Sequence, residues 1–208
     1  MIKAVLFDLD GVLVDACDWH YNALNEALIN HAFCAISRKD HETKFNGLPT
    51  RTKLEKLGIS LQSIMRIEAT KQEITKQYID RDCKLDQSKI NLFQYLRSSG
   101  MLVCIVTNCS EETARLMLKK IGVGEMYDFL VHNRDTKFQK PHPDPYFFAM
   151  ARLGVKPYEC LIVEDSPKGI EAAKASGAYL IDVKDSIEVH TSSVSWAIEA
   201  INYSQKNF

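Results

Sequence analysis

Two aspartates separated by one residue, Asp8 and Asp10, follow a short apolar run over residues 2–6. On a strand, side chains two apart share a face, so both carboxylates would project together from its carboxyl end. Gly11 follows and permits a sharp change of chain direction. Two like charges this close repel, so the pair needs a cation, a shared proton or a basic neighbour. An acidic loop without chemistry is the alternative that these residues alone leave open.

Three later segments carry side chains suited to phosphate chemistry: Thr107 with Asn108, Lys140, and Glu164 with Asp165. Thr107 and Asn108 offer hydroxyl and amide donors just before a predicted helix, whose free N–H groups favour an anion. Lys140 supplies a cation for charge that builds in a transition state. The further acids make a hard divalent cation such as Mg²⁺ close to obligatory. A plain turn and a solvated loop lysine are the simpler alternatives.

The spacing of apolar residues indicates which elements must position these groups. Strand-length apolar runs alternate with helical patterns after residue 84. We expect strands at residues 2–8, 101–106, 129–132, 160–163 and 179–183. The alternation predicts an α/β fold, a doubly wound parallel sheet with helices on both faces. Loops at the carboxyl ends of its strands would then meet at one crevice.

Residues 16–84 contain no strand-like run and read as helical. Helical patterns cover residues 16–33 and 50–57 and a longer stretch that ends near Arg81, while residues 37–45 suit a short helix. The loop signal of Asn46 and Gly47 precedes Thr50, which is placed to cap the next helix. We therefore expect a core of residues 1–15 and 85–208 and a small helical domain of residues 16–84.

Composition narrows the class of partner. The 208 residues carry a net charge of -1, so no overall field favours nucleic acid or an anionic membrane. No apolar run reaches the roughly 18 residues of a membrane span, and the first residues are too short for a secretory signal core. The six cysteines form no C-x-x-C pair and suit a reducing compartment, hence the cytoplasm. We expect a monomer or weak dimer without a nucleic-acid or membrane partner.

Four motifs, DLDGVLVD, IVTN, QKPHPDP and IVEDSPKGIEAAKASGA, occur in this order. With this order and spacing the chain resembles the haloacid dehalogenase superfamily of phosphotransferases over essentially its whole length. The helical domain resembles the subclass I cap of that family. The most similar branch is β-phosphoglucomutase and its phosphatase relatives.

The resemblance implies roles for the acidic residues. Asp8 resembles the nucleophile that forms an aspartyl-phosphate. Asp10 resembles the general acid/base, with a pKa that we expect its like-charged neighbours to raise. By resemblance, Asp8, the backbone carbonyl of Asp10, and Asp165 are Mg²⁺ ligands. Glu164 is a ligand either directly or through water.

The cap residues concern specificity. His20 resembles a histidine that links the general acid to cap closure in the mutase branch, but it also suits an ordinary helix face. Arg51, in G-L-P-T-R-T, matches the basic cap-loop position that holds a second phosphate in the mutase, although such charges are often solvated. Thr107-Asn108 departs from the mutase pattern of Ser-Ala or Ser-Ser and is phosphatase-like, which puts mutase activity in doubt.

Three further residues have structural expectations. Asp15 is placed to cap the first helix of the cap. Cys109 is expected to be a small buried residue, because nothing local lowers its pKa. Trp196 is expected in the core.

The leading hypothesis is a Mg²⁺-dependent phosphatase that hydrolyses a small phosphorylated metabolite, with sugar phosphates among the candidates. A sugar phosphomutase of the β-phosphoglucomutase type is the alternative. A haloacid dehalogenase needs neither the second aspartate nor the metal-binding acids. A phospho-accepting receiver domain has no helical insert, and a silent binding protein would not need every reactive position filled.

Overall fold

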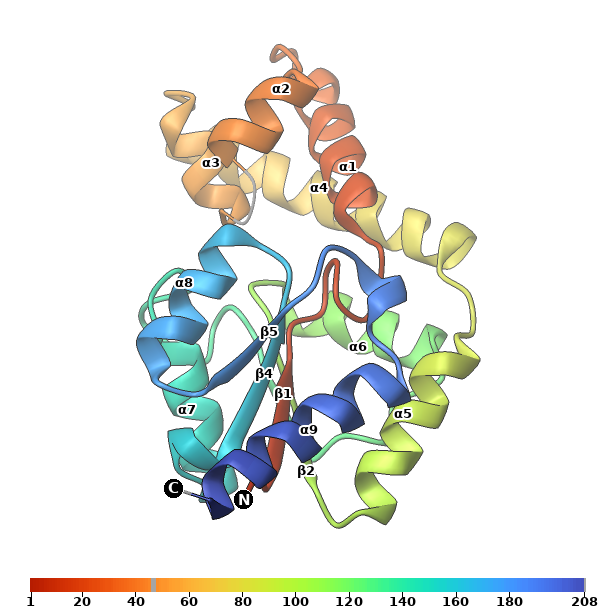
Figure 1. Cartoon of the computed structure of the whole chain (residues 1–208). Coiled ribbons are helices and arrows are strands. Elements are labelled where there is room, and N and C mark those ends of the chain that lie inside the picture. The colour runs from red at the N-terminus through yellow and green to blue at the C-terminus, as the bar shows by residue number, and fades with distance from the viewer. Residues whose placement is uncertain (46–47, 208) are drawn as a thin grey trace.

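The computed structural model describes residues 1–45 and 48–207 and contains one parallel sheet (Figure 1). Its strand order is β3-β2-β1-β4-β5. The strands are β1 (Ala4–Phe7), β2 (Leu102–Val106), β3 (Phe129–Val131), β4 (Cys160–Glu164) and β5 (Tyr179–Asp182). The predicted doubly wound parallel sheet is confirmed.

Strand β1 occupies the centre of the sheet. Ala4 pairs with Leu102 of β2 on one side and with Cys160 of β4 on the other. The chain runs from β1 to β2 and β3 in one direction and then crosses to β4 and β5 in the other. The carboxyl end of β1 therefore lies at the point where the strand order reverses, which is where ligands bind in open α/β sheets.

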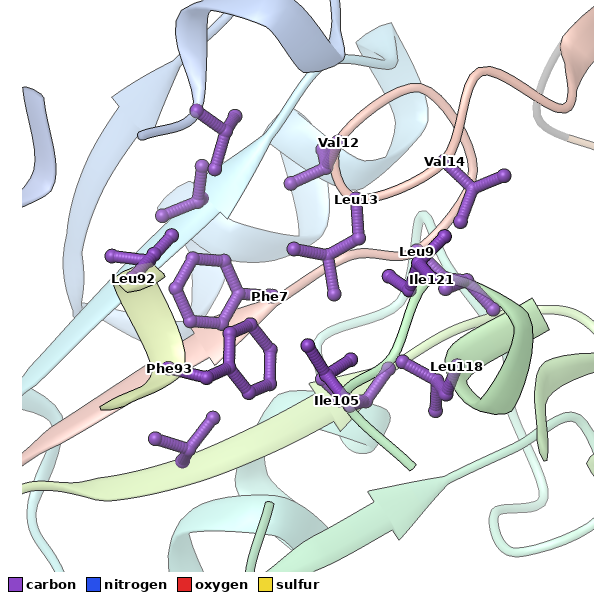
Figure 2. Close-up of a cluster of buried hydrophobic side chains, with 14 of the residues drawn as sticks. Phe7, Leu9, Val12, Leu13, Val14, Leu92, Phe93, Ile105, Leu118 and Ile121 are labelled. Atoms are coloured by element: carbon purple, nitrogen blue, oxygen red, sulfur yellow. The ribbon is translucent and has the colours of Figure 1, made fainter. Parts of the chain in front are cut away.

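Helices cover both faces of the sheet (Figure 1). They are α5 (Gln87–Ser98), α6 (Glu111–Lys120), α7 (Asp144–Leu153), α8 (Pro167–Ser176) and α9 (Thr191–Lys206). Val5 and Phe7 of β1 join the cluster that α5, α6 and α9 cover, where Phe7 stacks on Phe93 at 5.5 Å between ring centroids (Figure 2). Ala4 and Leu6 face α7 and α8. This alternation lets one strand bury both faces, as its continuous apolar sequence predicts.

The segment between β1 and α5 is helical throughout its described elements. It contains α1 (Cys17–Asn30), α2 (Arg38–Asp40) with a π-helical turn over His41–Phe45, α3 (Thr50–Lys56) and α4 (Leu61–Asp82). These elements, the helical insert, lie over the carboxyl ends of the strands (Figure 1). They bury their own apolar cluster, which includes Leu24, Leu54 and Ile67. The insert thus has a core separate from that of the sheet.

Helix α4 also ties the insert to the α/β core. Gln72 hydrogen-bonds Ser110 at 2.5 Å and Thr113 as well, at the start of α6. Lys76 pairs with Glu112 of α6 at 2.7 Å. The insert therefore sits against the sheet's carboxyl edge through a polar interface.

Several predicted helix boundaries agree with the structure, and three residue expectations do not. Ser166 caps α8, accepting from the Gly169 N–H at 3.1 Å. Thr50 is the first residue of α3 and makes no cap, because Pro49 occupies the N-cap position. Asp15 does not cap α1 either, since Ala16 stands at its N-cap without a side-chain bond.

Trp196, expected in the core, is 72% exposed on α9. The predicted loop at residues 46–47 lies outside the described residues. Among the described helices, none has the length and apolar character needed to cross a membrane.

Candidate active site

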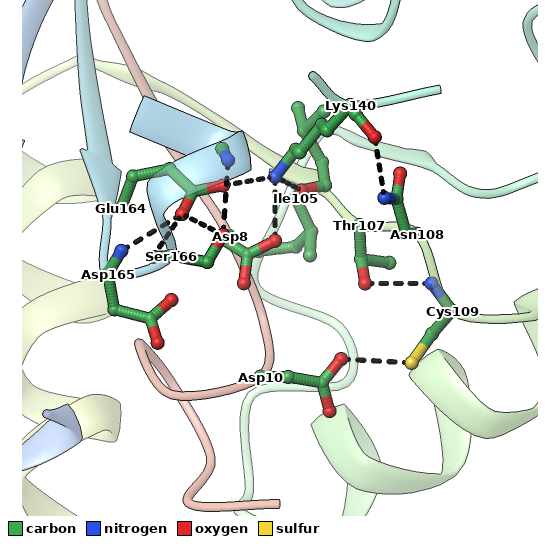
Figure 3. Close-up of polar contacts among 12 residues, drawn as sticks. Asp8, Asp10, Ile105, Thr107, Asn108, Cys109, Lys140, Glu164, Asp165 and Ser166 are labelled. Atoms are coloured by element: carbon green, nitrogen blue, oxygen red, sulfur yellow. Dashed lines mark hydrogen bonds and ion pairs between the residues drawn. The ribbon is translucent and has the colours of Figure 1, made fainter. Parts of the chain in front are cut away.

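Lys140 is the residue on which the distant motifs converge. Its ammonium donates to Asp8 Oδ1 at 2.7 Å, to Glu164 Oε1 at 2.6 Å and to the Val106 carbonyl at 2.7 Å (Figure 3). The lysine is buried, and so are both carboxylates. These partners raise the pKa of Lys140 well above its ordinary value even though burial opposes the charge. The predicted loops therefore do meet around one ammonium group.

Glu164 is fully buried at the end of β4, and both of its oxygens are engaged. Oε1 accepts from the lysine and from the Tyr146 hydroxyl at 3.1 Å. Oε2 accepts from the backbone N–H of Asp165 at 2.9 Å and of Ser166 at 3.1 Å. A Cβ at Gly169 would lie 1.7 Å from Oε1, so the carboxylate fills the space that this glycine leaves open. The arrangement fixes Glu164 as the group that orients Lys140.

The acids at the strand ends form an oxygen cluster suited to a hard cation. Carboxylate oxygens of Asp8, Glu164 and Asp165 lie within 4.8 Å of one another. Asp165 Oδ1 is buried and has no hydrogen-bond partner among residues 1–45 and 48–207. A Cβ at Gly11, where φ is +88°, would meet Asp165 Oδ2 at 2.1 Å, so only glycine leaves room for this carboxylate. The donor set and the unpartnered oxygen fit Mg²⁺.

The charges in this cluster are not balanced by the protein alone. Burial raises the pKa of Asp165 to about 7, and the charges of Glu164 and Asp10 add to the effect. Burial likewise raises the pKa of Asp8 well above its ordinary value, although Lys140 opposes the shift. A divalent cation would remove the repulsion and keep both carboxylates ionised.

Asp10 is surrounded by partners of a different kind. His20 Nε2 lies 2.8 Å from Oδ1, and the Cys109 thiol donates to Oδ2 at 2.9 Å. Lys71 Nζ of α4 lies 3.1 Å from Nδ1 of the same histidine. Burial favours a raised pKa, but the charge and hydrogen bond of His20 outweigh it and lower the pKa of Asp10 to about 2. The expected upward shift was therefore wrong, because the histidine contributes more than the neighbouring acids.

Thr107 and Asn108 follow β2 beside this group. Thr107 Oγ1 accepts from the Cys109 N–H at 3.0 Å, and Asn108 Nδ2 donates to the Lys140 carbonyl at 3.4 Å (Figure 3). Ser110 caps α6, accepting from the Thr113 N–H at 3.3 Å. The two candidate phosphate donors thus lie between Asp10 and Lys140. Burial raises the pKa of Cys109 well above its ordinary value, in line with the expected unreactive thiol.

The insert presents lysines rather than the expected arginine. The Arg51 guanidinium is largely exposed and pairs with Glu68 at 2.8 Å. Lys53, two residues on, is only 9% exposed, and its side-chain ammonium has no ion-pair or hydrogen-bond partner within residues 1–45 and 48–207. Burial first, and then the charges of Lys71 and Lys168, lower the pKa of Lys53 to about 8.

The sequence held a signal for Lys71 that motif reasoning missed. Ile64, Ile67 and Ile74 belong to the buried stripe of α4, and Lys71 occupies the position of that stripe between Ile67 and Ile74. A lysine at a core-facing position points to a buried charge with a partner. His20 is that partner.

Comparison with known proteins agrees with this geometry. The family pattern described as haloacid dehalogenase-like hydrolase matches residues 5–183. β-Phosphoglucomutase of Bacillus subtilis is 28% identical, with 88% of this chain and 83% of that protein covered. A phosphorylated carbohydrates phosphatase of Thermotoga maritima is 25% identical, with 85% and 82% covered. The solved structure of β-phosphoglucomutase from Clostridium difficile superposes with a TM-score of 0.83 at 22% identity, covering 98% of this chain and 99% of that one.

The parallel sheet and the family match together define a phosphohydrolase with an α/β fold. The chain belongs to the haloacid dehalogenase-like hydrolase family and is a phosphohydrolase of that family.

Proposed function

We propose that the protein is a Mg²⁺-dependent phosphatase that hydrolyses a small phosphorylated metabolite through an aspartyl-phosphate on Asp8. The observation that carries the proposal is the contact of Lys140 with Asp8 at 2.7 Å beside an oxygen cluster suited to a cation. An ionised carboxylate is a nucleophile that needs no base. The ammonium beside it neutralises charge on a phosphoryl group that the carboxylate attacks.

The remaining groups have roles that follow from their positions. Asp10, ionised in the resting site, takes a proton from solvent when the approaching, negatively charged phosphate raises its pKa. It then protonates the leaving oxygen and later accepts a proton from the attacking water. Thr107 and Asn108 hold phosphoryl oxygens. His20, joined to Lys71, keeps the Asp10 carboxylate oriented.

Asp8, Asp165 and the backbone carbonyl of Asp10 would hold Mg²⁺, which supplies positive charge for bringing a phosphate dianion to a carboxylate. Glu164 acts on the ion through water in this proposal, because its oxygens already accept from the lysine, a tyrosine and backbone N–H groups. We also propose that the helical insert, residues 16–84, is a cap that covers the substrate.

The buried lysines of the insert bear on the substrate. The Lys53 ammonium lacks a partner in the described part of the chain, and burial and the repulsion of Lys71 both lower its pKa. An anionic or strongly polar substrate group between them would remove that repulsion. Sugar phosphates fit this requirement, and the Thermotoga relative is named for phosphorylated carbohydrates. We propose Lys53 in place of Arg51 as the cation that the cap offers to the substrate.

The contact of His20 with Asp10 at 2.8 Å favours a second candidate, a sugar phosphomutase. A relative 28% identical carries the name β-phosphoglucomutase. In a mutase the phosphoryl group would pass from Asp8 to a second hydroxyl of the sugar instead of to water. The asparagine at position 108 favours the phosphatase.

The test is turnover of p-nitrophenyl phosphate with Mg²⁺, with and without a chelator. Asp8→Asn should abolish turnover, whereas Asp15→Asn, at an exposed aspartate outside the cluster, should preserve it. Full activity of Asp8→Asn would refute the mechanism. Incubation with β-glucose 1-phosphate then separates the two candidates, because a phosphatase yields free phosphate and a mutase yields glucose 6-phosphate.

A further inference from the structure

A second group of potential metal ligands lies beside the oxygen cluster and has a different chemistry. Asp10, His20 and Cys109 bring one carboxylate oxygen, one ring nitrogen and one sulfur within 4.8 Å of one another. They come from three separate places in the chain: the end of β1, helix α1 and the loop after β2. We propose that this trio binds Zn²⁺ and that zinc held there inhibits the enzyme.

The donor types select the metal. Zn²⁺ is bound in proteins by cysteine sulfur, histidine nitrogen and carboxylate oxygen, whereas Mg²⁺ takes oxygen ligands and retains water. The oxygen cluster of Asp8, Glu164 and Asp165 contains no nitrogen or sulfur donor. The two neighbouring sites therefore favour different cations, one hard and one borderline-soft.

The distances require only a small adjustment. Donor atoms bound to one zinc at about 2.0–2.3 Å lie roughly 3.3–3.6 Å apart in a tetrahedron. Cys109 Sγ and His20 Nε2 already lie 3.5 Å apart. The Asp10 contacts, now hydrogen bonds of 2.8 Å to the histidine and 2.9 Å to the thiol, must open by about half an ångström. The fourth position is left for water or a substrate oxygen, as in open zinc sites.

Zinc binding should release a fixed number of protons from the ligands. The Cys109 thiol loses its proton to solvent when the sulfur binds the metal. Coordination through His20 Nε2 requires the ring proton on Nδ1, which faces Lys71 at 3.1 Å. The histidine–lysine pair must therefore release a second proton to solvent, so that two protons leave for each zinc bound.

Zinc at this site would act on the reaction through Asp10. A carboxylate bound to zinc can neither protonate a leaving oxygen nor accept a proton from water. This consequence rests on the proposed role of Asp10, whereas the binding itself does not. Cys109 has no part in the proposed reaction, so its thiol is a zinc ligand that the reaction does not need.

Binding is tested by calorimetry on the full chain with saturating Mg²⁺ and by cobalt substitution. We expect one zinc per chain, two protons released in buffers of different ionisation enthalpy, and a thiolate-to-cobalt charge-transfer band with Co²⁺. Cys109→Ser should weaken zinc binding at least about 100-fold and remove the band, since even loss of an outer partner costs roughly 10–100-fold. Cys34→Ser, at an exposed thiol of the insert, is the matched control and should leave both unchanged.

Activity provides the second arm. Zinc should inhibit the wild type and Cys34→Ser at the same concentration, and each Cys109→Ser rate should be compared with its own zinc-free rate. The proposal is overturned if Cys109→Ser and His20→Gln both bind zinc as tightly as the wild type. It is also overturned if added Mg²⁺ displaces the zinc competitively, because the ion would then lie at the oxygen cluster. If the zinc-free wild type binds zinc as expected but shows no phosphatase activity, the proposed reaction is contradicted and the zinc site is not.

Discussion

Lys140 Nζ lies 2.7 Å from Asp8 Oδ1, although 132 residues separate the two in the chain. The contact exists because β1 is central in the sheet and the loop before α7 returns to its carboxyl end. The same ammonium also holds Glu164 at 2.6 Å, so one cation serves two buried carboxylates. A site built in this way retains an excess of negative charge, which the proposed divalent cation would balance.

Replacing Lys140 by Met should affect both activity and stability. Removal of one electrostatic group aimed at a transition state lowers kcat by about 10²–10³-fold. Removal of one partner from a buried ion pair costs roughly 3–5 kcal/mol of unfolding free energy. Steady-state kinetics and urea unfolding measure the two effects. Lys137→Met, at an exposed lysine of the same loop, is the control. Wild-type kcat in Lys140→Met would contradict the assignment.

The pKa of Asp165 should make the proposed binding of Mg²⁺ depend on pH. Burial raises this pKa to about 7 in the metal-free site, so protons compete with the cation below that value. The apparent affinity for Mg²⁺ should therefore fall by up to about tenfold for each pH unit below 7. Calorimetric Mg²⁺ titrations between about pH 5 and about pH 8, a range that includes this pKa, measure the change in affinity.

Asp165→Asn should bind Mg²⁺ weakly at every pH and lose the part of the pH dependence that Asp165 contributes, while the part due to the raised pKa of Asp8 remains. Asp15→Asn, at an exposed position, should behave as the wild type. An affinity for Mg²⁺ that does not change across this range in the wild type would argue against Asp165 as a ligand.

His20 should control the protonation of Asp10. The histidine lowers the pKa of Asp10 to about 2, so the carboxylate is ionised over the whole working range before substrate binds. In His20→Gln this support is lost and the pKa of Asp10 rises, so the acid limb of the kcat/KM profile, which reports the free enzyme, moves to higher pH. His142→Gln, at a histidine that pairs with Asp144 in the loop, is the control. An unshifted acid limb in His20→Gln would show that the histidine does not act on the base.

Most of the fold could be predicted because the inner strands β1, β2 and β4 bury both faces and appear as apolar runs, whereas the edge strand β5 is partly exposed. The residues of the core site could be located for a related reason: all of them follow a strand or precede a helix, where backbone direction fixes the side chains. The gathering of Lys140 with Asp8 follows from topology alone. Gly11 is explained in the same way, because its missing Cβ leaves room for the Asp165 carboxylate.

The helical insert was harder to predict because helix position decides which side chain faces the site. Residues two apart on an α-helix point about 200° apart. Arg51 and Lys53 therefore lie on opposite sides of α3, and the motif alone could not tell which one is buried. The pKa of Asp10 depends on His20, which lies ten residues further along the chain. Trp196 lies on a terminal helix that covers the sheet with its other face.

Lys53 should reduce stability in the absence of substrate. Lowering its pKa from 10.5 to about 8 corresponds to a cost of roughly 3 kcal/mol. The cost is complete below pH 8, where the lysine is charged in both states, and it vanishes as pH rises toward 10.5. Lys53→Met should therefore raise the unfolding free energy at about pH 7, where the lysine is charged in both states. It should have less effect at about pH 10, where the folded protein has lost that charge. Urea unfolding at both pH values measures it.

The same substitution should raise KM for a substrate with a second anionic group and leave the KM of p-nitrophenyl phosphate nearly unchanged. Arg51→Met is the matched control from the same helix and should alter neither KM nor stability by more than about 0.5 kcal/mol, as is usual for surface residues. A larger effect at Arg51 than at Lys53 would reverse our assignment of the cap cation.

Gly169 should be essential for the position of Glu164. A Cβ there would lie 1.7 Å from Oε1 and 1.9 Å from Cδ of this buried carboxylate, which has no free space to move into. Gly169→Ala must therefore displace Glu164, and with it Lys140, at a cost of about 1–3 kcal/mol or more for overpacking. Gly154→Ala is a useful control, because that glycine has φ of +68° and open space around its Cβ position. It should lose only about 1 kcal/mol of stability through backbone strain and retain full kcat. If Gly169→Ala also retains full kcat, the glycine does not set the geometry of the lysine.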